Sequence, residues 1–444
     1  MKNNWRQKLH LEPVSGWLND PNGLCFFGGY YHVYFQYAPE SPYGKGGKCW
    51  GHWQSPDLLN WTFTGTVLRP DIPEDRNGVY SGCAFPDGGI LRLFYTGNVK
   101  EEGDHDYTTS GRGANVITVS TSNGHAMSEK KVLLRNSDYP SYCSCHVRDP
   151  KVWKDANIYR MVLGARTLSD EGCVLFYTSP DLENWSFEKR VSIQDFGYMW
   201  ECPDLFRIDG REYLSISPQG IPHEEYRFQN VYSSGYFSAE KELADYQEWD
   251  FGFDFYAPQT FEVPDGRRII IGWMGIGDIP YTNPTAELGW QHCLTVPREI
   301  TAAADGSLRQ APVRELEKLR RGSSELTDGM TVELPFELSA ESYGDFSIEL
   351  GDYLIFEYAD GVFTMRFTDD KAGCGRDIRK VRLSSCKDIR LLADTSSVEV
   401  YLSGGERVMS SRFYPADTSA KLSFRGLSGT IYELDEMEVK SDGK

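Results

Sequence analysis

Three acidic residues share one local setting, which is where chemistry could reside. Asp20 and Asp149 stand directly before a proline, Glu201 stands two residues before one, and strand-forming residues follow each. Proline lacks a backbone donor and disfavours helix at the preceding residue, so each carboxylate is expected in a turn at a strand end. Turns of this composition are common, and with 65 acidic residues a single solvated acid would be unremarkable. The repetition of the setting is what singles out these three.

Paired carboxylates in a cleft that also contains aromatic residues suit the cleavage of glycosidic bonds. One carboxylate must be ionised to attack or stabilise the sugar, and the other must be protonated to release the leaving oxygen. Asp20, beside the amide of Asn19, suits the ionised nucleophile. Glu201, between Trp200 and Cys202, suits the general acid.

A repeat predicts how distant strands bring these acids together. Residues 55–61 (Ser-Pro-Asp-Leu-Leu-Asn-Trp) recur at 179–185 (Ser-Pro-Asp-Leu-Glu-Asn-Trp), and a weaker relative lies at 120–124. Each copy follows a strand-like run, and the repeating unit is about 60 residues long, which is compatible with a propeller blade carrying inserted loops. About five such units fit, so residues 1–308 are predicted to form a five-bladed β-propeller. The alternative is a β-sandwich in which the repeat arises by chance.

The remainder of the chain changes pattern twice. Residues 309–322 are predicted to form a linker helix, because Pro312 suits a first helical position, Gly322 suits a stop, and three apolar residues share one face: Val313, Leu316 and Leu319. Beyond it apolar and polar residues alternate, as in Phe346, Ile348 and Leu350. This alternation predicts antiparallel hairpins and a β-sandwich over residues 323–444. The predicted fold class is therefore all-β.

Composition excludes several classes of partner. The formal charge of −19 and the pI of about 4.9 disfavour nucleic acid and anionic membrane surfaces, both of which attract clustered Lys and Arg. Residues 1–13 lack the apolar core of a signal peptide, and no apolar stretch is long enough for a membrane span, so a cytoplasmic protein is expected. The ten cysteines are scattered and are predicted to be free thiols. Cys143, Cys145 and His146 have no second ligand pair at finger spacing, so no metal site is predicted.

Seven motifs, in order, resemble the signature set of glycoside hydrolase family 32, which includes invertases, fructan exohydrolases and sucrose-6-phosphate hydrolases. They are Trp-Leu-Asn-Asp-Pro-Asn-Gly at 17–23, Phe-Gln-Tyr at 35–37, Trp-Gly-His at 50–52, Tyr-Ser-Gly at 80–82, Arg-Asp-Pro at 148–150, Glu-Cys-Pro-Asp at 201–204 and Asp-Phe-Tyr-Ala-Pro-Gln-Thr-Phe at 254–261. The resemblance spans the whole chain. It implies a five-bladed β-propeller with the active site in its central funnel, followed by a β-sandwich.

The resemblance also implies roles for individual residues. Asp20 would be the nucleophile, Glu201 the general acid/base and Asp149 the stabiliser that holds fructosyl hydroxyls. The expected substrate-binding residues are Asn19, Gln36, Ser81 and Arg148 as hydrogen-bonding groups, Trp17, Tyr80 and Trp273 as pocket walls, and Trp50. Tyr43, which stands where many relatives have a tryptophan, is expected near the leaving group, and Cys83 replaces a serine with an effect on packing only.

The mechanism expected from this set is a retaining hydrolysis of terminal β-fructofuranosyl units in sucrose and short fructo-oligosaccharides, with no metal or organic cofactor. Retention requires the carboxyl groups of Asp20 and Glu201 to lie about 5 to 5.5 Å apart. A sucrose-6-phosphate hydrolase is the first alternative, with Lys45 and Lys48 as candidate phosphate ligands. A furanosidase for arabinose or xylose, a fructosyl transferase and a non-catalytic carbohydrate-binding protein are the others, and a homo-oligomer stays open.

Overall fold

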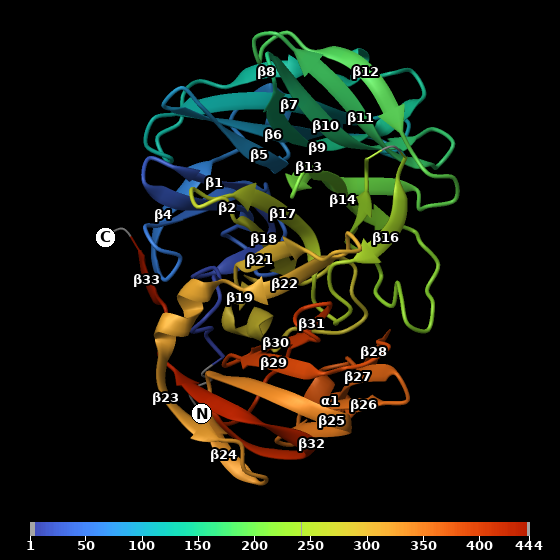
Figure 1. Ribbon diagram of the computed structural model, residues 1–444. Coiled ribbons are helices and arrows are strands. Elements are labelled where there is room, and N and C mark those ends of the chain that lie inside the picture. Colours follow the sequence, from blue (N-terminus) through green and yellow to red (C-terminus); the bar gives the residue numbers. More distant parts are fainter. Residues whose placement is uncertain (1–4, 241, 442–444) are drawn as a thin grey trace.

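The computed structural model describes residues 5–240 and 242–441. Its regular structure is nearly all β-strand, as the sequence predicts, with one α-helix, α1 (Asp370–Gly373), among the described residues. Figure 1 shows two parts: a β-propeller from the N-terminal two thirds of the chain and, below it in this view, a β-sandwich-like sheet system from the C-terminal third. Within the described ranges, no helix is long and apolar enough to cross a membrane.

Five sheets are built from residues 16–312. The first contains β1 (Gly16–Phe27), β2 (Tyr30–Ala38), β3 (Cys49–Ser55) and β4 (Asn60–Leu68); the second β5 (Val79–Asp87), β6 (Ile90–Lys100), β7 (Arg112–Thr121) and β8 (Lys131–Leu134). The third contains β9 (Cys143–Asp155), β10 (Ile158–Thr167), β11 (Gly172–Ser179) and β12 (Ser186–Val191); the fourth β13 (Met199–Ile208), β14 (Arg211–Gln219), β15 (Gly235–Ser238) and β16 (Ala244–Glu248). The fifth contains β17 (Tyr256–Glu262), β18 (Arg268–Met274), β20 (Cys293–Leu294), β21 (Arg298–Ala302) and β22 (Leu308–Pro312). Three short 3-10 helices lie between these strands: η1 (Pro73–Asp75), η2 (Asn136–Asp138) and η3 (Pro284–Leu288).

The first strands of the five sheets contact one another in a closed order. β1 contacts β5, β5 contacts β9, β9 contacts β13, β13 contacts β17, and β17 contacts β1. A further link between the chain's start and the fifth sheet is β19 (Trp290–Gln291), which pairs in parallel with β1. Residues on these first strands, far apart in sequence, therefore meet at the centre of the propeller.

The sequence repeat is a turn that joins the third and fourth strands of a sheet. Asp57 accepts backbone N–H bonds from Leu59 (3.0 Å) and Asn60 (2.8 Å). Asp181 accepts the equivalent bonds from residues 183 (2.9 Å) and 184 (2.8 Å). In both copies the tryptophan that ends the motif donates its indole N–H back to the turn, which explains why these residue types recur.

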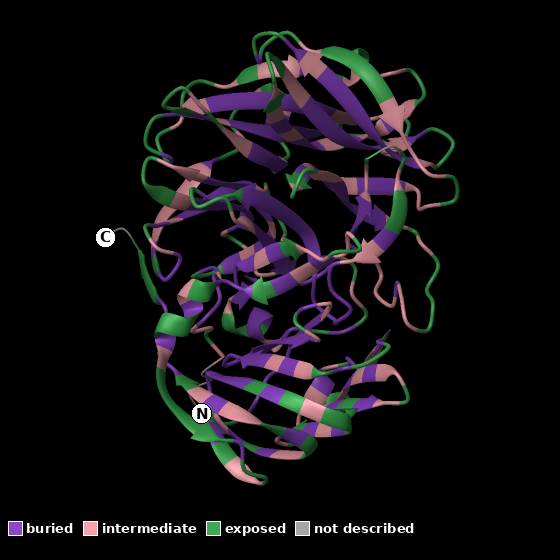
Figure 2. Ribbon diagram, viewed as in Figure 1, coloured by how far each residue is buried: buried purple, intermediate pink, exposed green. Residues whose placement is uncertain are grey.

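The C-terminal part follows the predicted hairpins. A row of strands β28-β27-β26-β25-β29-β30-β31 is extended by β32, which pairs with β23, β24 and β25. The strands are β23 (Arg320–Glu325), β24 (Met330–Glu333), β25 (Phe336–Leu350), β26 (Leu354–Ala359), β27 (Val362–Phe367), β28 (Ile378–Arg382), β29 (Asp388–Ala393), β30 (Ser397–Leu402), β31 (Arg407–Arg412) and β32 (Ser419–Leu434). Alternate residues of β25 to β27 are buried in one core, visible as alternating colours along these strands in Figure 2.

Two features differ from the sequence-based prediction. The linker helix expected over 309–322 is only a 3-10 helix, η4 (Arg314–Leu319). The residues before it form β22, which pairs with β21, and the residues from Arg320 onward form β23, which pairs with β32. Both ends of the predicted helix are therefore in β-strands. In addition, β33 (Glu438–Ser441) leaves the C-terminal part and pairs in parallel with β4 at the edge of the propeller (Figure 1).

A buried ionic cluster joins the N-terminal segment, the propeller and the C-terminal part. His10 lies 2.8 Å from Asp394 and 2.9 Å from Glu399, and all three side chains are fully buried. Glu399 also pairs with Arg298 (2.8 Å), which pairs with Asp250 (3.1 Å). Although burial alone would lower the pKa of His10, the two carboxylates raise it to about 9.

Candidate active site

The first strand of every propeller sheet carries a β-bulge against the second strand. In each, the first strand advances three residues where its partner advances two. The residues inserted in this way are Asn19 and Asp20 in β1, Tyr80 and Ser81 in β5, Asp149 and Pro150 in β9, Cys202 and Pro203 in β13, and Ala257 and Pro258 in β17. Since a bulge re-aims side chains and leaves residues out of the ladder, these bulges aim functional groups into the centre of the ring.

The bulges explain two of the three prolines near the acids, Pro150 and Pro203. Proline cannot donate to a sheet ladder and is tolerated where a bulge leaves a residue unpaired. The turn predicted at Asp20 is therefore a bulged stretch inside β1, because the strand continues on both sides of it. Asp149, at φ 63°, and Cys202, at φ 47°, adopt a backbone conformation that is uncommon for residues other than glycine.

Asp20 is held by donors on two strands. Ser81 donates its hydroxyl to Oδ2, and Asn19 donates its amide to Oδ1 at 3.1 Å. Gln36 fixes both donors, because it accepts from Asn19 (3.1 Å) and donates to the Ser81 oxygen (2.6 Å). Burial raises the pKa of Asp20 above its usual value, while the bonds from Ser81 and Asn19 lower it and so favour the ionised form.

Glu201 accepts four hydrogen bonds. Arg148 donates to Oε1 through Nε (3.0 Å) and Nη2 (2.7 Å). Gln219 (2.6 Å) and the Tyr256 hydroxyl (2.7 Å) both donate to Oε2. This carboxyl group is therefore fixed in position by three side chains from three different sheets.

Asp149 is buried and shares Cys202 as a neighbour with Asp20. Its Oδ2 accepts the backbone N–H of Cys202 at 2.9 Å, and the Cys202 thiol contacts both Asp149 and Asp20. Burial raises the pKa of Asp149, with Glu201 adding to the rise, while Arg148 lowers it. The charge of Glu201 thus raises the pKa of both Asp20 and Asp149, and clustered carboxylates of this kind are typical of catalytic sites.

Arginines surround the acids on one side. Arg148 pairs with Glu201, and its Nε also lies 3.9 Å from Asp149 Oδ2. Burial lowers the pKa of Arg148, but the two acids outweigh this effect, so its pKa is raised. His146 lies between Arg148 (2.9 Å) and Arg112 (3.3 Å). Burial and both arginines lower the pKa of His146 to about 3, so its ring is neutral and can accept from them. In the Cys143–His146 segment, His146 is therefore the residue that contacts Arg112 and Arg148.

One cavity of about 270 Å³ is lined by most of the predicted site residues. They are Asn19, Asp20, Gln36, Tyr80, Ser81, Arg148, Asp149, Glu201 and Trp273. Trp17 supports the cavity from outside: its indole N–H donates to Asn19 at 2.9 Å, and its ring packs edge-on against Trp273.

Two predicted residues lie elsewhere. Trp50 is fully buried in the third strand of its sheet, two strands away from the axis, and donates to the backbone carbonyl of Tyr80 at 3.0 Å, so it supports the wall from behind. Tyr43 lies on a loop, is 58% exposed and does not line the cavity.

The cavity also has walls that the sequence prediction missed. They are Arg112, Gln219, Tyr232, Tyr256, Gly277 and Asp278, while Lys48, expected only as a candidate phosphate ligand, lines the same cavity. Tyr256 belongs to the motif at 254–261 and could have been identified from it, because that motif places a polar aromatic residue at a bulge. The others lie at strand ends or on loops, where no local pattern marked them. Burial lowers the pKa of Lys48 to about 8, against the attraction of Asp20.

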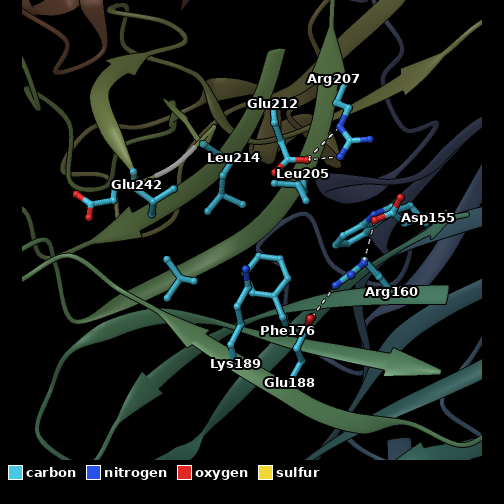
Figure 3. A pocket seen from close by; sticks show the side chains of 14 residues that line it. Asp155, Arg160, Phe176, Glu188, Lys189, Leu205, Arg207, Glu212, Leu214 and Glu242 are labelled. Carbon is cyan, nitrogen blue, oxygen red and sulfur yellow. Dashed lines mark hydrogen bonds and ion pairs between the residues drawn. The ribbon is translucent and has the colours of Figure 1, made fainter. Parts of the chain in front are cut away.

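A second cavity of about 300 Å³ lies between the third and fourth sheets (Figure 3). Five of its charged side chains pair with each other: Arg160 with Asp155 (3.2 Å) and Glu188 (2.7 Å), and Arg207 with Glu212 (2.9 Å). None of the buried, unpartnered polar atoms found over 5–240 and 242–441 belongs to its lining. The central cavity, which contains three acids and the side chains that donate hydrogen bonds to them, is therefore the candidate active site.

Comparison with protein families agrees with this geometry. Residues 10–312 match the model described as Glycosyl hydrolases family 32 N-terminal domain, and residues 363–441 match Glycosyl hydrolases family 32 C terminal. The chain belongs to glycosyl hydrolases family 32. It is a glycoside hydrolase with the family's two matched regions in the family's order.

Relatives of this family 32 enzyme match over nearly their whole length. A sucrose-6-phosphate hydrolase from Bacillus subtilis is 36% identical, with 92% of this chain and 89% of that protein covered. A raffinose invertase from Escherichia coli is 38% identical, with 98% and 94% covered.

Solved structures show the same fold. Sucrose-6-phosphate hydrolase from Lactobacillus gasseri superposes with a TM-score of 0.86 at 27% identity, covering 98% of this chain and 94% of that one. A family 32 beta-fructofuranosidase from Bombyx mori superposes with a TM-score of 0.84 at 29% identity, covering 98% and 95%.

Proposed function

We propose that this family 32 hydrolase is a retaining β-fructofuranosidase that releases terminal β-D-fructofuranosyl units from sucrose and short fructo-oligosaccharides. The observation that carries the proposal is the pair Asp20 and Glu201 in one cavity, with different partners. Asp20 receives donors that favour its ionised form, while Glu201 lies among groups that can hold it through a change of protonation. Two such carboxylates are what a double-displacement glycosidase needs.

In the first step Asp20 attacks the anomeric carbon of the fructosyl unit, and Glu201 gives its proton to the departing glycosidic oxygen. In the second step Glu201, now ionised, takes a proton from water, which cleaves the fructosyl-enzyme ester and regenerates Asp20. Two inversions at one carbon return the original configuration. Asp149 and Arg148 are positioned to hold fructosyl hydroxyls, and Asp149 also keeps negative charge near the developing cation.

The side of the cavity that receives each part of the substrate follows from the roles of the acids. The fructosyl unit must lie at Asp20, where Asn19, Gln36 and Trp273 line the wall. The leaving group must lie beyond Glu201, where Gln219, Tyr232 and Asp278 line the wall. This second set replaces Tyr43 as the proposed leaving-group environment.

Sucrose 6-phosphate is the second candidate substrate, and one observation favours it beside the names of the relatives. Arg112 lines the cavity, and its Cζ lies 5.7 Å from the centroid of the Tyr80 ring. In the described part of the chain Arg112 forms no ion pair with a carboxylate, unlike Arg148. Arginine binds phosphate well through paired donors. Comparing kcat/KM for sucrose, sucrose 6-phosphate and 1-kestose decides between the candidates, and a strong preference for the phosphate ester that Arg112→Ala removes would replace our choice.

The direct test of the mechanism is Asp20→Asn, with Asp181→Asn in an exposed repeat turn as the matched control. We expect Asp20→Asn to lose about 10⁴-fold or more of kcat for fructose release, because the nucleophile is gone, while its circular dichroism spectrum and Tm stay close to wild type. Asp181→Asn should keep wild-type turnover. A folded Asp20→Asn enzyme with substantial activity would remove Asp20 from the role.

We further propose that the five sheets are the five blades of the propeller, and that the chain divides into a catalytic domain and a sandwich domain within residues 309–322. The closed order of first-strand contacts and the break between the two family matches support this division. A cytoplasmic location is proposed because all ten cysteines are free thiols, as is usual in a reducing compartment. Expression with a fluorescent tag tests the location.

A further inference from the structure

The four hydrogen bonds on Glu201 raise a question about its proton. All four come from donors, which suits an ionised carboxylate: two from Arg148 on Oε1, and one each from Gln219 and Tyr256 on Oε2. The proposed function, on which this inference rests, also requires Glu201 to be a carboxylic acid at the start of each cycle. In the free enzyme, before a glycosidic oxygen is present, the new O–H on Glu201 then needs an acceptor among these groups.

Only one of the four partner atoms can accept a hydrogen bond. The guanidinium nitrogens of Arg148 and the amide nitrogen of Gln219 are donors only, whereas a tyrosine hydroxyl can donate and accept. The Tyr256 oxygen lies 2.7 Å from Glu201 Oε2 and also 3.2 Å from the backbone carbonyl of Ser217. Its hydroxyl hydrogen therefore has two acceptors within reach and can bond to only one at a time.

We propose that Tyr256 is a proton-dependent positioning residue for Glu201. When Glu201 is ionised, the Tyr256 hydroxyl donates to Oε2. When Glu201 is protonated on Oε2 in the free enzyme, the Glu201 O–H donates to the Tyr256 oxygen, and the Tyr256 O–H turns about its C–O bond to donate to the Ser217 carbonyl. When substrate is bound, the Glu201 O–H turns from Tyr256 to the leaving oxygen. No proton passes to or from Tyr256, and the proton that reaches the leaving oxygen is the one on Glu201.

The surroundings keep these atoms in place through the exchange. Ser217 lies directly opposite Glu201 in the pairing of β13 with β14, so one strand pair fixes the carboxylate and the carbonyl relative to each other. Tyr256 is buried at the bulge of β17, next to the ring of Tyr232 at 5.8 Å. Burial, with Glu201 beside it, raises the pKa of Tyr256 well above its usual value, so its hydroxyl stays protonated throughout.

The test is Tyr256→Phe, measured as kcat and kcat/KM for sucrose across pH. A hydrogen bond to an ionised group is about twice as strong as one to a neutral group, so the variant mainly loses support for ionised Glu201. We expect kcat to fall about 10- to 100-fold with KM within about threefold, and the alkaline limb of kcat/KM to move up by about 0.5 to 1 pH unit. The control is Tyr232→Phe. The Tyr232 hydroxyl donates to Asp278 (2.7 Å) and not to Glu201, so its loss should leave the alkaline limb in place.

A second measurement gives the opposite sign and avoids removing the hydroxyl. Replacing Tyr256 by 3,5-difluorotyrosine makes its O–H a stronger donor and its oxygen a weaker acceptor, so the alkaline limb should move to lower pH. If both variants fold and leave the limb at its wild-type position, or if only KM changes, Tyr256 is a structural residue and the proposal is wrong. Absence of fructose release by the wild-type enzyme would instead contradict the proposed function.

Discussion

Ser81→Ala is the sharpest perturbation of the proposed nucleophile that leaves the nucleophile itself intact. The Ser81 hydroxyl donates to Asp20 Oδ2 and accepts a hydrogen bond from the Gln36 amide at 2.6 Å. Alanine removes this donor and leaves Asn19 as the remaining side-chain donor that lowers the pKa of Asp20. Burial already raises the pKa of Asp20, so the pKa should rise further when one of the groups that lower it is removed.

The size of the effect follows from the bond that is lost. A hydrogen bond to a charged group contributes about 1.5 to 3 kcal/mol, and one pKa unit corresponds to about 1.4 kcal/mol. The pKa of Asp20 in the free enzyme should therefore rise by about one to two units. Because Asp20 must be ionised to attack, the acid limb of kcat/KM moves to higher pH by the same amount.

The assay is fructose release from sucrose, measured as kcat/KM across pH. Below both limbs Ser81→Ala should be about 10- to 100-fold slower than wild type, and the defect should shrink towards neutral pH. Ser55→Ala, which removes a hydroxyl that donates to Asp57 at 3.2 Å in a repeat turn, should leave the limb in place. An equal loss at every pH, or a limb that moves to lower pH, would refute the reasoning about Asp20.

Two further predictions concern stability. His10 has a folded-state pKa of about 9, above its usual value of 6.5, so the stability it contributes is fully present below about pH 6.5 and is lost as pH rises through about 9. The Tm gap between wild type and His10→Gln should therefore narrow between those pH values in thermal scans, and a gap that widens would contradict the assignment. Arg298→Met leaves Glu399 and Asp250 buried with fewer partners and should cost about 3 to 5 kcal/mol in the free energy of unfolding, measured with denaturant. The control Arg160→Met breaks two partly exposed pairs, with Asp155 and Glu188, and should cost less than about 1 kcal/mol, so equal losses would be the contradicting result.

Much of the site could be predicted from sequence because its residues sit on bulges with a recognisable composition. Asp20, Asp149 and Glu201 precede prolines. Pro150 and Pro203 occupy inserted positions of their bulges, whereas in β1 Asp20 itself is inserted and Pro21 pairs with Phe35. The repeat turns could be predicted for a similar reason: Asp57 and Asp181 organise them through bonds within a few residues. Local chemistry of this kind is readable in one segment at a time.

The remaining features depend on distant pairing. Trp50 belongs to a motif that includes polar residues, yet its strand is the third of its sheet and its ring turns into the core. The predicted linker helix has the right apolar spacing, but its two ends are strands that pair with β21 and β32. Gln219 reaches the cavity from the end of β14, the strand paired with β13, and Asp278 reaches it from the loop after β18, which no local pattern specifies.

The central claim is that Asp20 forms a fructosyl-enzyme that water or another hydroxyl compound opens with retention. The most direct measurement is proton NMR of early product from sucrose in the presence of methanol, where mutarotation cannot blur the result. Double displacement predicts methyl β-D-fructofuranoside as the methanolysis product. Formation of the α anomer would mean a single displacement and would contradict the account.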